Sequence, residues 1–441
     1  MRTELDPCRD GGEDCLEPRA CGASAERAWT AARALVWSLL VTAAPGACGV
    51  EGARDSSQAT VTDSAGIRVV ESPDGSIYRV LTQEPVLAIG SVDGSDGASF
   101  GYVADGLLSP DRGVAVADQL AQAVLVFDSS GARATTWGGP GQGPGEYGMI
   151  TRLDRYRGDS VLVTEIGSHR LSVLSRTGVF GRLITPRPGL DARPGFESVS
   201  SCCIGWGAET EGGGLLMGFP ELIPLSGPAP RWSVVRLVRT AAEGDAVADY
   251  GSFRGGRYGV STDAPTPPPY HYNNAVSIAP RDVGFGVTDG LSHEVRFHGA
   301  NGRLETVGRI LRPRAPVTDR MRAATEAYFD RERARIGEAM AEGAGFDQLR
   351  SGPYPDSLPA YTVLLLDEAG NAWAGSFHAP QLEQSARFDV FATDGRFLGS
   401  VLVPLEGRVL DVHAGHLLAV VRDELDVQYV QVYGLVAPVG S

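Results

Sequence analysis

The feature that most constrains the fold of this sequence is a hairpin pattern that recurs along most of its length. In five copies, a glycine follows two apolar residues that stand seven and five positions before it. Because alternate residues of a strand point to the same side, each copy predicts a strand with one apolar face that ends in a glycine turn. The copies are Val124, Val126 and Gly131; Leu171, Val173 and Gly178; Val295, Phe297 and Gly302; Phe388, Val390 and Gly395; and Val427, Tyr429 and Gly434.

Three of these copies extend the pattern upstream. An acid stands thirteen residues before the glycine and follows another apolar run, and these acids are Asp118, Glu165 and Asp289. A sixth and weaker copy runs from Val234 to Gly244. One hypothesis for the acids is a ring of carboxylates that binds a cation or a basic ligand. Recurrence at one repeat position favours the other hypothesis, in which each carboxylate caps its turn by accepting backbone N–H bonds.

Six copies predict an all-β fold, a six-bladed β-propeller over residues 61–437. The closest glycine pairs are 47 and 39 residues apart. A period of about 40–50 residues with several strands is typical of propeller blades, which bury their faces against one another. An early strand, either Ile67–Val70 or Pro85–Gly90, is expected to pair within the last blade and close the ring, which removes an open edge.

Three insertions interrupt the repeat. One is a helical insertion between late blades at about 318–344, where Thr318 can cap a helix and Asp319 lies in its first turn. The others surround Cys202–Trp206 and span Pro265–Asn274. Because long insertions in compact folds are often functional, we expect ligand recognition here. The candidate residues combine aromatic area with hydrogen bonding, and they are Tyr270, His271, Tyr272, Asn273 and Asn274. The alternative is that these loops only cover one end of the channel.

The first 48 residues are predicted to be a leader. Ala34–Ala44 is an apolar run of 11 residues, which is shorter than the roughly 20 that cross a membrane and typical of a signal peptide. Small residues precede Cys48 and resemble a bacterial lipobox, so we expect lipid on Cys48 and export to the bacterial cell envelope. Residues 49–60 are predicted to be a flexible tether. Plain secretion and a cytoplasmic chain are the alternatives, and the acidic residues 1–26 suit a start site placed too far upstream.

The repeat resembles a known type. Val114–Asp118 followed by Val124–Gly131 resembles an NHL-type propeller repeat, and so does Glu165–Leu174. Together with the leader, the chain is similar to the six-bladed β-propeller lipoproteins of environmental bacteria. The resemblance covers most of residues 61–437 and implies a fold and an envelope location. It implies no catalytic residue, because a propeller fold does not by itself define a function.

Composition and motifs argue against several functions. The net charge is −15 and no basic run reverses it, which disfavours nucleic acid and leaves a lipid anchor as the expected membrane contact. The flanks of Gly97–Gly101 lack the strand and helix of a nucleophile elbow. Gly138–Gly145 lacks the Gly-Lys-Ser/Thr ending of a phosphate loop. We interpret both segments as turns.

No cofactor or metal ligand is predicted. Asp93, Asp96 and Gly97 leave Ca²⁺ as an open alternative, although their spacing does not match an EF-hand. The seven histidines show no zinc-site spacing. Cys202 and Cys203 are adjacent and therefore either free thiols or a strained disulfide, because neighbouring Cα atoms lie about 3.8 Å apart, closer than a disulfide usually requires.

The sequence thus predicts a binding module with loop-borne recognition of an unknown protein, peptide or carbohydrate, and no catalytic residue. The alternative is a metal-dependent, lactonase-like or lyase-like propeller enzyme. Such enzymes hold their metal with Glu, Asp and Asn in the channel. Of the four asparagines, only Asn273 and Asn274 stand in a loop suited to a channel mouth.

Overall fold

The computed structural model describes most of the chain after residue 58. The described residues are 59–91, 98–158, 160–166, 170–187, 204–210, 214–221, 231–259, 268–281, 283–337, 346–379, 382, 385–404 and 407–438. The leader with Cys48, the tether, the Asp93–Gly97 segment and the Cys202–Cys203 pair lie outside these ranges. All described residues belong to one compact unit, Asp55–Ser441.

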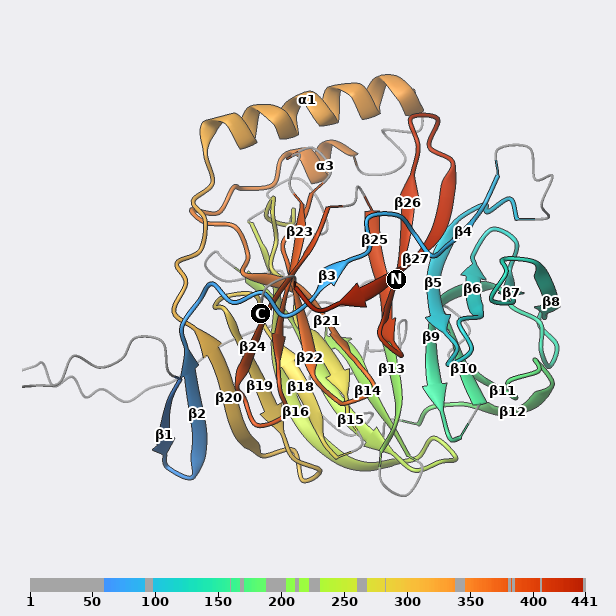
Figure 1. Cartoon of the computed structure of the whole chain (residues 1–441), viewed down its shortest axis with the longest axis horizontal. Helices are drawn as coiled ribbons and strands as arrows, with labels where there is room; N and C mark the ends of the chain where they lie inside the picture. Colours follow the sequence, from blue (N-terminus) through green and yellow to red (C-terminus); the bar gives the residue numbers. More distant parts are fainter. Residues whose placement is uncertain are drawn as a thin grey trace, which may run out of the picture. The chain divides into compact units, whose positions relative to one another are not determined.

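The strands form six antiparallel blades around a common centre (Figure 1). In order, the blades are β5 (Val103–Leu108), β6 (Val114–Asp118), β7 (Ala123–Phe127) and β8 (Arg133–Trp137); β9 (Met149–Tyr156), β10 (Ser160–Ile166), β11 (Leu171–Leu174) and β12 (Phe180–Ile184); β13 (Ile204–Thr210), β14 (Gly214–Glu221), β15 (Arg231–Thr240) and β16 (Ala246–Tyr258); β17 (Ser277–Pro280), β18 (Phe285–Thr288), β19 (Glu294–His298) and β20 (Leu304–Ile310); β21 (Tyr361–Leu366), β22 (Ala372–Ser376), β23 (Ala386–Phe391) and β24 (Phe397–Val403); and β25 (Gly407–His413), β26 (His416–Arg422) and β27 (Gln428–Val436). The first strands contact one another in a closed circuit, β5 to β9, β13, β17, β21, β25 and back to β5. The predicted six-bladed propeller is confirmed.

The ring closes through the N-terminal part of the described chain. The strand β4 (Leu87–Ile89) pairs antiparallel with β27, so an early strand supplies the outer edge of the last blade, as predicted for Pro85–Gly90. The other candidate, Ile67–Val70, lies in β2 (Ile67–Ser72), which pairs parallel with β20 of the fourth blade instead. β1 (Thr60–Ser64) pairs with β2, and β3 (Val80–Leu81) pairs with β27.

Between these pairings, the chain also crosses the outer edge of the fifth blade. Ile77 forms a parallel bridge with Ser400 of β24, and the Tyr78 N–H donates to the Ser400 carbonyl at 2.8 Å. We call residues 67–89 the N-terminal strap. It contacts the outer strands of the fourth, fifth and sixth blades. The chain segment that closes the ring therefore binds three of the six blades.

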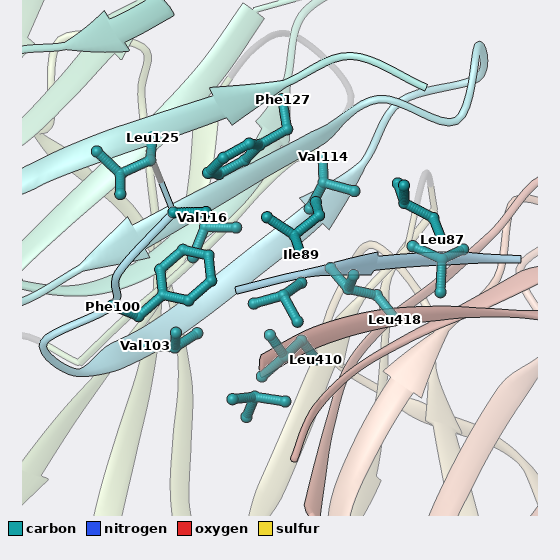
Figure 2. Packing of buried hydrophobic residues seen from close by; sticks show 14 of the residues in the cluster. Leu87, Ile89, Phe100, Val103, Val114, Val116, Leu125, Phe127, Leu410 and Leu418 are labelled. Atoms are coloured by element: carbon teal, nitrogen blue, oxygen red, sulfur yellow. The ribbon is translucent and has the colours of Figure 1, made fainter. Parts of the chain in front are cut away.

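The core lies between the blades. Figure 2 shows the cluster between the last blade and the first, which includes Leu410 and Leu418 of the last blade, Val116 and Leu125 of the first, and Ile89 of the strap. Burying one such side chain contributes about 1.5–3 kcal/mol relative to leaving it exposed. A single blade would leave both faces in water, which is why the unit is repeated.

The glycine turns follow the prediction in five copies. The glycine lies between the third and fourth strands with a positive φ at Gly131, Gly178, Gly244, Gly302 and Gly395. The expectation of a turn at Gly434 is wrong, because Gly434 lies inside β27. The last blade takes its outer strand from the strap, so its third strand continues through Gly434 and no hairpin turn forms there.

The acids of the repeat cap turns, as their recurrence favoured. Asp118 accepts backbone N–H bonds from Gly101 at 2.8 Å and from Leu120 at 3.0 Å. Glu165 accepts the N–H of Gly148 at 2.7 Å, and Asp289 accepts that of Leu291 at 2.9 Å. Each carboxylate therefore satisfies buried or turn N–H groups that would otherwise lack a partner.

The helical insertion between the fourth and fifth blades is confirmed. α1 spans Asp319–Ile336, and the Thr318 hydroxyl accepts the Met321 N–H at 3.3 Å as an N-cap. The helix ends at Gly337, before the predicted end at about 344, and residues 338–345 lie outside the described ranges. α3 (Phe346–Arg350) follows. In the part of the chain that the structure describes, no helix is both long and apolar enough to span a membrane.

Candidate ligand-binding site

Two of the three predicted insertions lie at the same end of the propeller. The loop at residues 268–276 and the segment with α1 and α3 each connect the outer strand of one blade to the inner strand of the next, and such connections all leave one end of the blades. Figure 1 shows α1 lying across that end. A direct contact joins the two insertions, because the Tyr272 hydroxyl donates to the Met321 carbonyl at 2.7 Å. We call this end the α1 face.

The predicted recognition residues mostly bond within the protein. His271, Tyr272 and Asn274 are buried, and Tyr270 and Asn273 are half-buried. Asn273 pairs with both backbone groups of Arg257, at 2.7 and 2.9 Å. Asn274 donates to the carbonyls of residues 255 and 289, at 2.9 and 3.0 Å. That these residues contact a ligand stays a prediction, while their visible role is to hold the α1 face together.

The same residues anchor α1. The His271 ring stacks on Tyr354 with centroids 4.3 Å apart and meets Phe329 of the helix edge-on. Burial lowers the pKa of His271, so its ring is neutral at pH 7 and Nε2 can donate to the Arg350 carbonyl at 3.1 Å. The Tyr272 hydroxyl also lies 2.6 Å from the Thr325 hydroxyl. The first turns of α1 are therefore fixed to the propeller.

Farther along, α1 covers a cavity of about 1450 Å³. We call it the α1-face cavity. Its lining comes from the inner strands β5, β9, β21 and β25, from the ends of β22 and β23, from the turn between β26 and β27, and from Tyr328, Glu332 and Arg335 of the helix. Figure 1 shows that turn rising to the C-terminal end of α1. Ligand pockets usually measure about 300–1,000 Å³, so this cavity has room for a ligand larger than a simple metabolite.

The walls of the cavity are largely apolar. Val363 and Leu365 come from β21, Val409 and Leu410 come from β25, and Tyr102 lies just before β5. Tyr102 is 40% exposed and Leu410 is 6% exposed. The wall is therefore solvent-exposed at Tyr102 and buried at Leu410.

Asp105 is the polar group with the most unusual environment in the cavity. Its two oxygens accept the N–H groups of Gly106 at 2.9 Å and Leu153 at 3.0 Å. The residue is half-buried and lines the cavity. Burial raises the pKa of Asp105 to about 7, against the lowering effect of the Arg152 charge and the two N–H donors. A carboxyl that titrates near neutral pH is uncommon and clusters at functional sites.

Two arginines share the cavity with Asp105. Arg152 of β9 directs Nε to both oxygens of Asp154, at 2.8 and 2.9 Å. Arg408 of β25 donates to the carbonyls of Ala104 at 2.9 Å and Val103 at 2.7 Å, which ties β25 to β5. The inner side of the cavity therefore combines guanidinium groups with a protonatable carboxyl.

The outer side of the cavity has the opposite charge. The turn between β26 and β27 carries Asp423, Glu424 and Asp426, and α1 adds Glu332. Two arginines offset part of this charge, because Arg422 pairs with Asp426 and Arg335 pairs with Glu332 at 2.7 Å. Leu425 at the tip of the turn is 74% exposed. The rim is thus acidic with one apolar tip.

The residues described here do not fit a metal centre. Among them, no group of three or more His, Cys, Asp or Glu side chains lies close enough to hold a metal ion. His413 is 3.9 Å from Glu368 and forms no larger cluster within these ranges. At the cavity, Arg152 beside Asp105 would repel a cation.

Sequence reasoning missed the cavity and its polar groups. Asp105 and Leu153 are 48 positions apart, and neither Asp105 nor Arg152 belongs to a motif. The available signal was that both stand near the start of the first strand of a blade. Inner strands of successive blades are neighbours, so residues at equivalent positions meet at one end of the channel.

Comparisons with known proteins add no functional assignment. No family model matches the chain, and no curated protein sequence matches it. Among solved structures, the chain is similar to a predicted exported protein from Bacteroides fragilis, with 11% identity, a TM-score of 0.45, and coverage of 84% of this chain and 100% of that chain. It is also similar to a calcium-binding protein, regucalcin, from Agrobacterium tumefaciens, with 12% identity, a TM-score of 0.37, and coverage of 82% and 98%. A gluconolactonase from Xanthomonas campestris gives 14% identity, a TM-score of 0.38, and coverage of 82% and 98%.

Proposed function

We propose that the protein is an exported binding module whose ligand enters the α1-face cavity. The observation that carries the proposal is a cavity of about 1450 Å³ that is lined by both apolar and charged side chains from the inner strands and α1, since ligands usually bind in concave sites of this kind. The loop at 268–276 and α1 lie at the same end and contact each other. Recognition by inserted segments on a rigid scaffold is a common arrangement.

The proposal keeps the bacterial cell envelope as the location and lipid on Cys48 as the anchor. A Cys48→Ser variant should release the protein from the membrane fraction, since stable attachment requires the buried acyl chains. Equal fractionation of the variant and the parent would show that Cys48 carries no anchor. This test is independent of the cavity.

A matched pair of substitutions tests the binding proposal. Thr362 lines the cavity at a bulge of β21, so Thr362→Trp fills part of it. Thr135 is exposed on β8, on the outer edge of the first blade, so Thr135→Trp adds the same bulk elsewhere. We expect that compounds from a library of peptides, glycans and small acids that raise the melting temperature do so in Thr135→Trp but not in Thr362→Trp. A library in which no stabilisation depends on position 362 would overturn the proposal.

One observation favours a second function, an enzyme in the same cavity. The Asp105 carboxyl faces the cavity, and burial raises its pKa to about 7, which suits a general acid or base at neutral pH. An enzyme of this kind would turn over a compound found by the screen, and Asp105→Asn would abolish that turnover without preventing binding.

A further inference from the structure

The polar side chains at the inner side of the cavity determine which chemical group of a ligand can bind there. We propose that Asp105 and Arg152 together bind a carboxylate carried by an apolar ligand, and that this ligand is a peptide with a free C-terminus. The inference rests on the proposed function, since it specifies the chemistry of the molecule that enters the α1-face cavity.

Arg152 has unused hydrogen-bonding capacity. Its Nε is bonded to Asp154, and its terminal nitrogens make no hydrogen bond to any described residue. The side chain is 33% exposed and lines the cavity. A guanidinium group presents its N–H groups in a planar fork that matches the two oxygens of a carboxylate. Arg152 can therefore keep its Nε bonds to Asp154 and donate from its terminal nitrogens to a ligand carboxylate.

The protonation state of Asp105 determines whether the site favours binding of the ligand carboxylate. When protonated, its carboxyl has an O–H that can donate to a ligand carboxylate, as charge-assisted O–H···O⁻ bonds do. When ionised, it is a like charge beside the ligand and opposes binding. The charges that act on it are those of Arg152 and Asp154 from β9, and Arg408 from β25 bonds to the carbonyls of Val103 and Ala104 beside it. His378, at the end of β22, lines the same cavity.

The remainder of the cavity favours a peptide over a sugar acid. The walls supplied by Val363, Leu365 and Val409 are aliphatic, and they match apolar side chains better than they match sugar hydroxyls, which would lose their hydrogen bonds to water. The acidic rim at Asp423 and Glu424 repels a carboxylate. The charge distribution thus directs the carboxylate inward, toward Arg152, and leaves the rest of the peptide toward the rim.

The probe is a mixture of N-acetylated hexapeptides of Ala, Val, Leu and Phe, prepared with a free C-terminal carboxylate and as the C-terminal amide. Binding to the full chain is measured by equilibrium dialysis with mass spectrometry. We expect the acids to bind at least about tenfold more tightly than the amides, because a charge-assisted pair is lost. If the protonated form of Asp105 binds, a pKa of about 7 predicts a roughly 30-fold weaker affinity at about pH 8.5 than at about pH 6.

Two variants and one control make the test specific. Arg152→Gln should remove the preference for the acid over the amide. Asp105→Asn should remove the pH dependence while keeping that preference, which separates Asp105 from His378. Arg303→Gln changes an exposed arginine in a turn at the opposite end of the fourth blade and should bind like the parent. Circular dichroism and melting temperature establish that each variant is folded.

The outcomes distinguish this inference from the proposed function. If acids and amides bind equally and Thr362→Trp abolishes both, the cavity is a binding site and the carboxylate inference is wrong. If only an oligouronate in a parallel assay binds, through Arg152, the peptide assignment is wrong. If Asp105→Asn retains the full pH dependence, Asp105 has no part in recognition.

Discussion

At the scale of single residues, Asp118 shows how one side chain maintains a blade. It is 1% exposed, and its two oxygens accept four backbone N–H groups, those of Gly101, Tyr102, Leu120 and Ala121. Two of these donors precede β5 and two follow β6. The carboxylate therefore fixes the turn after β6 to the start of β5, the innermost strand of the blade, which carries Asp105.

We expect Asp118→Asn to lower the free energy of unfolding by about 2–4 kcal/mol, because an amide nitrogen faces backbone donors and leaves buried N–H groups unpaired. Asp128→Asn is the control, since Asp128 caps the exposed turn before Gly131 with bonds to Ser130 and Ala132. Urea unfolding of both variants measures the difference. A loss at Asp118 no larger than that at Asp128 would contradict the capping role.

At the scale of elements, the Tyr272 hydroxyl holds the first turns of α1 against the propeller. Tyr272→Phe removes the bonds to Met321 and Thr325 and should raise amide exchange in the first turns of α1, with a cost of about 1–2 kcal/mol. Tyr250→Phe is the matched control, because Tyr250 bonds to the Ala300 carbonyl in a turn at the other end. Unchanged exchange in α1 after Tyr272→Phe would show that the helix is held by other contacts.

The N-terminal strap is the second element with a measurable role. Ile89 is 2% exposed between the last blade and the first, whereas Val61 of β1 is 49% exposed. We expect Ile89→Ala to cost about 2–5 kcal/mol, since it opens a void at the closure, while Val61→Ala stays within about 0.5 kcal/mol. Thermal and urea unfolding report both values, and similar losses would mean that the strap does not close the ring.

At the scale of the whole molecule, an ion network joins the strap to two blades. Arg312, which follows β20, donates to Asp74 of the strap at 2.7 Å and to Asp389 of β23 at 2.6 Å. Arg387 also bonds to both acids, at 3.0 Å each. The pKa of Asp74 is lowered chiefly by its hydrogen bond to Arg312, and the pKa of Asp389 is lowered because the bonds to Arg312 and Ser400 outweigh its burial.

These shifts predict how stability depends on pH. A lowered pKa in the folded state means that Asp74 and Asp389 stabilise the fold above about pH 4 and lose this contribution as the pH falls further. Asp105 has the opposite sign, because its raised pKa contributes stability that is lost as the pH rises from about 4 to about 7. Below about pH 4, melting temperatures should therefore fall more steeply toward acid in the parent than in Asp74→Asn. From about pH 4 to 7 they should fall more in the parent than in Asp105→Asn, and parallel curves would refute the assignments.

The scale of a feature determined whether the sequence could reveal it. The blades follow from local spacing, since the residues before Gly131 and Gly395 repeat at fixed distances. Thr318 marks the start of α1 for the same local reason. The cavity needs contacts between blades, and Asp74 lies 238 positions from Arg312. The turn predicted at Gly434 does not form, because the strand that pairs with β27 as its outer partner is β4, from the other end of the chain.

Hydrogen exchange of the full chain, with and without the tightest ligand from the screen, tests most directly whether the α1-face cavity is the binding site. The account predicts that protection concentrates on residues 328–336 of α1, on the turn at 423–427 and on the entry of β5. Protection confined to the opposite end of the blades, such as the turns around Gly131 and Gly302, with these three segments unchanged, would contradict it.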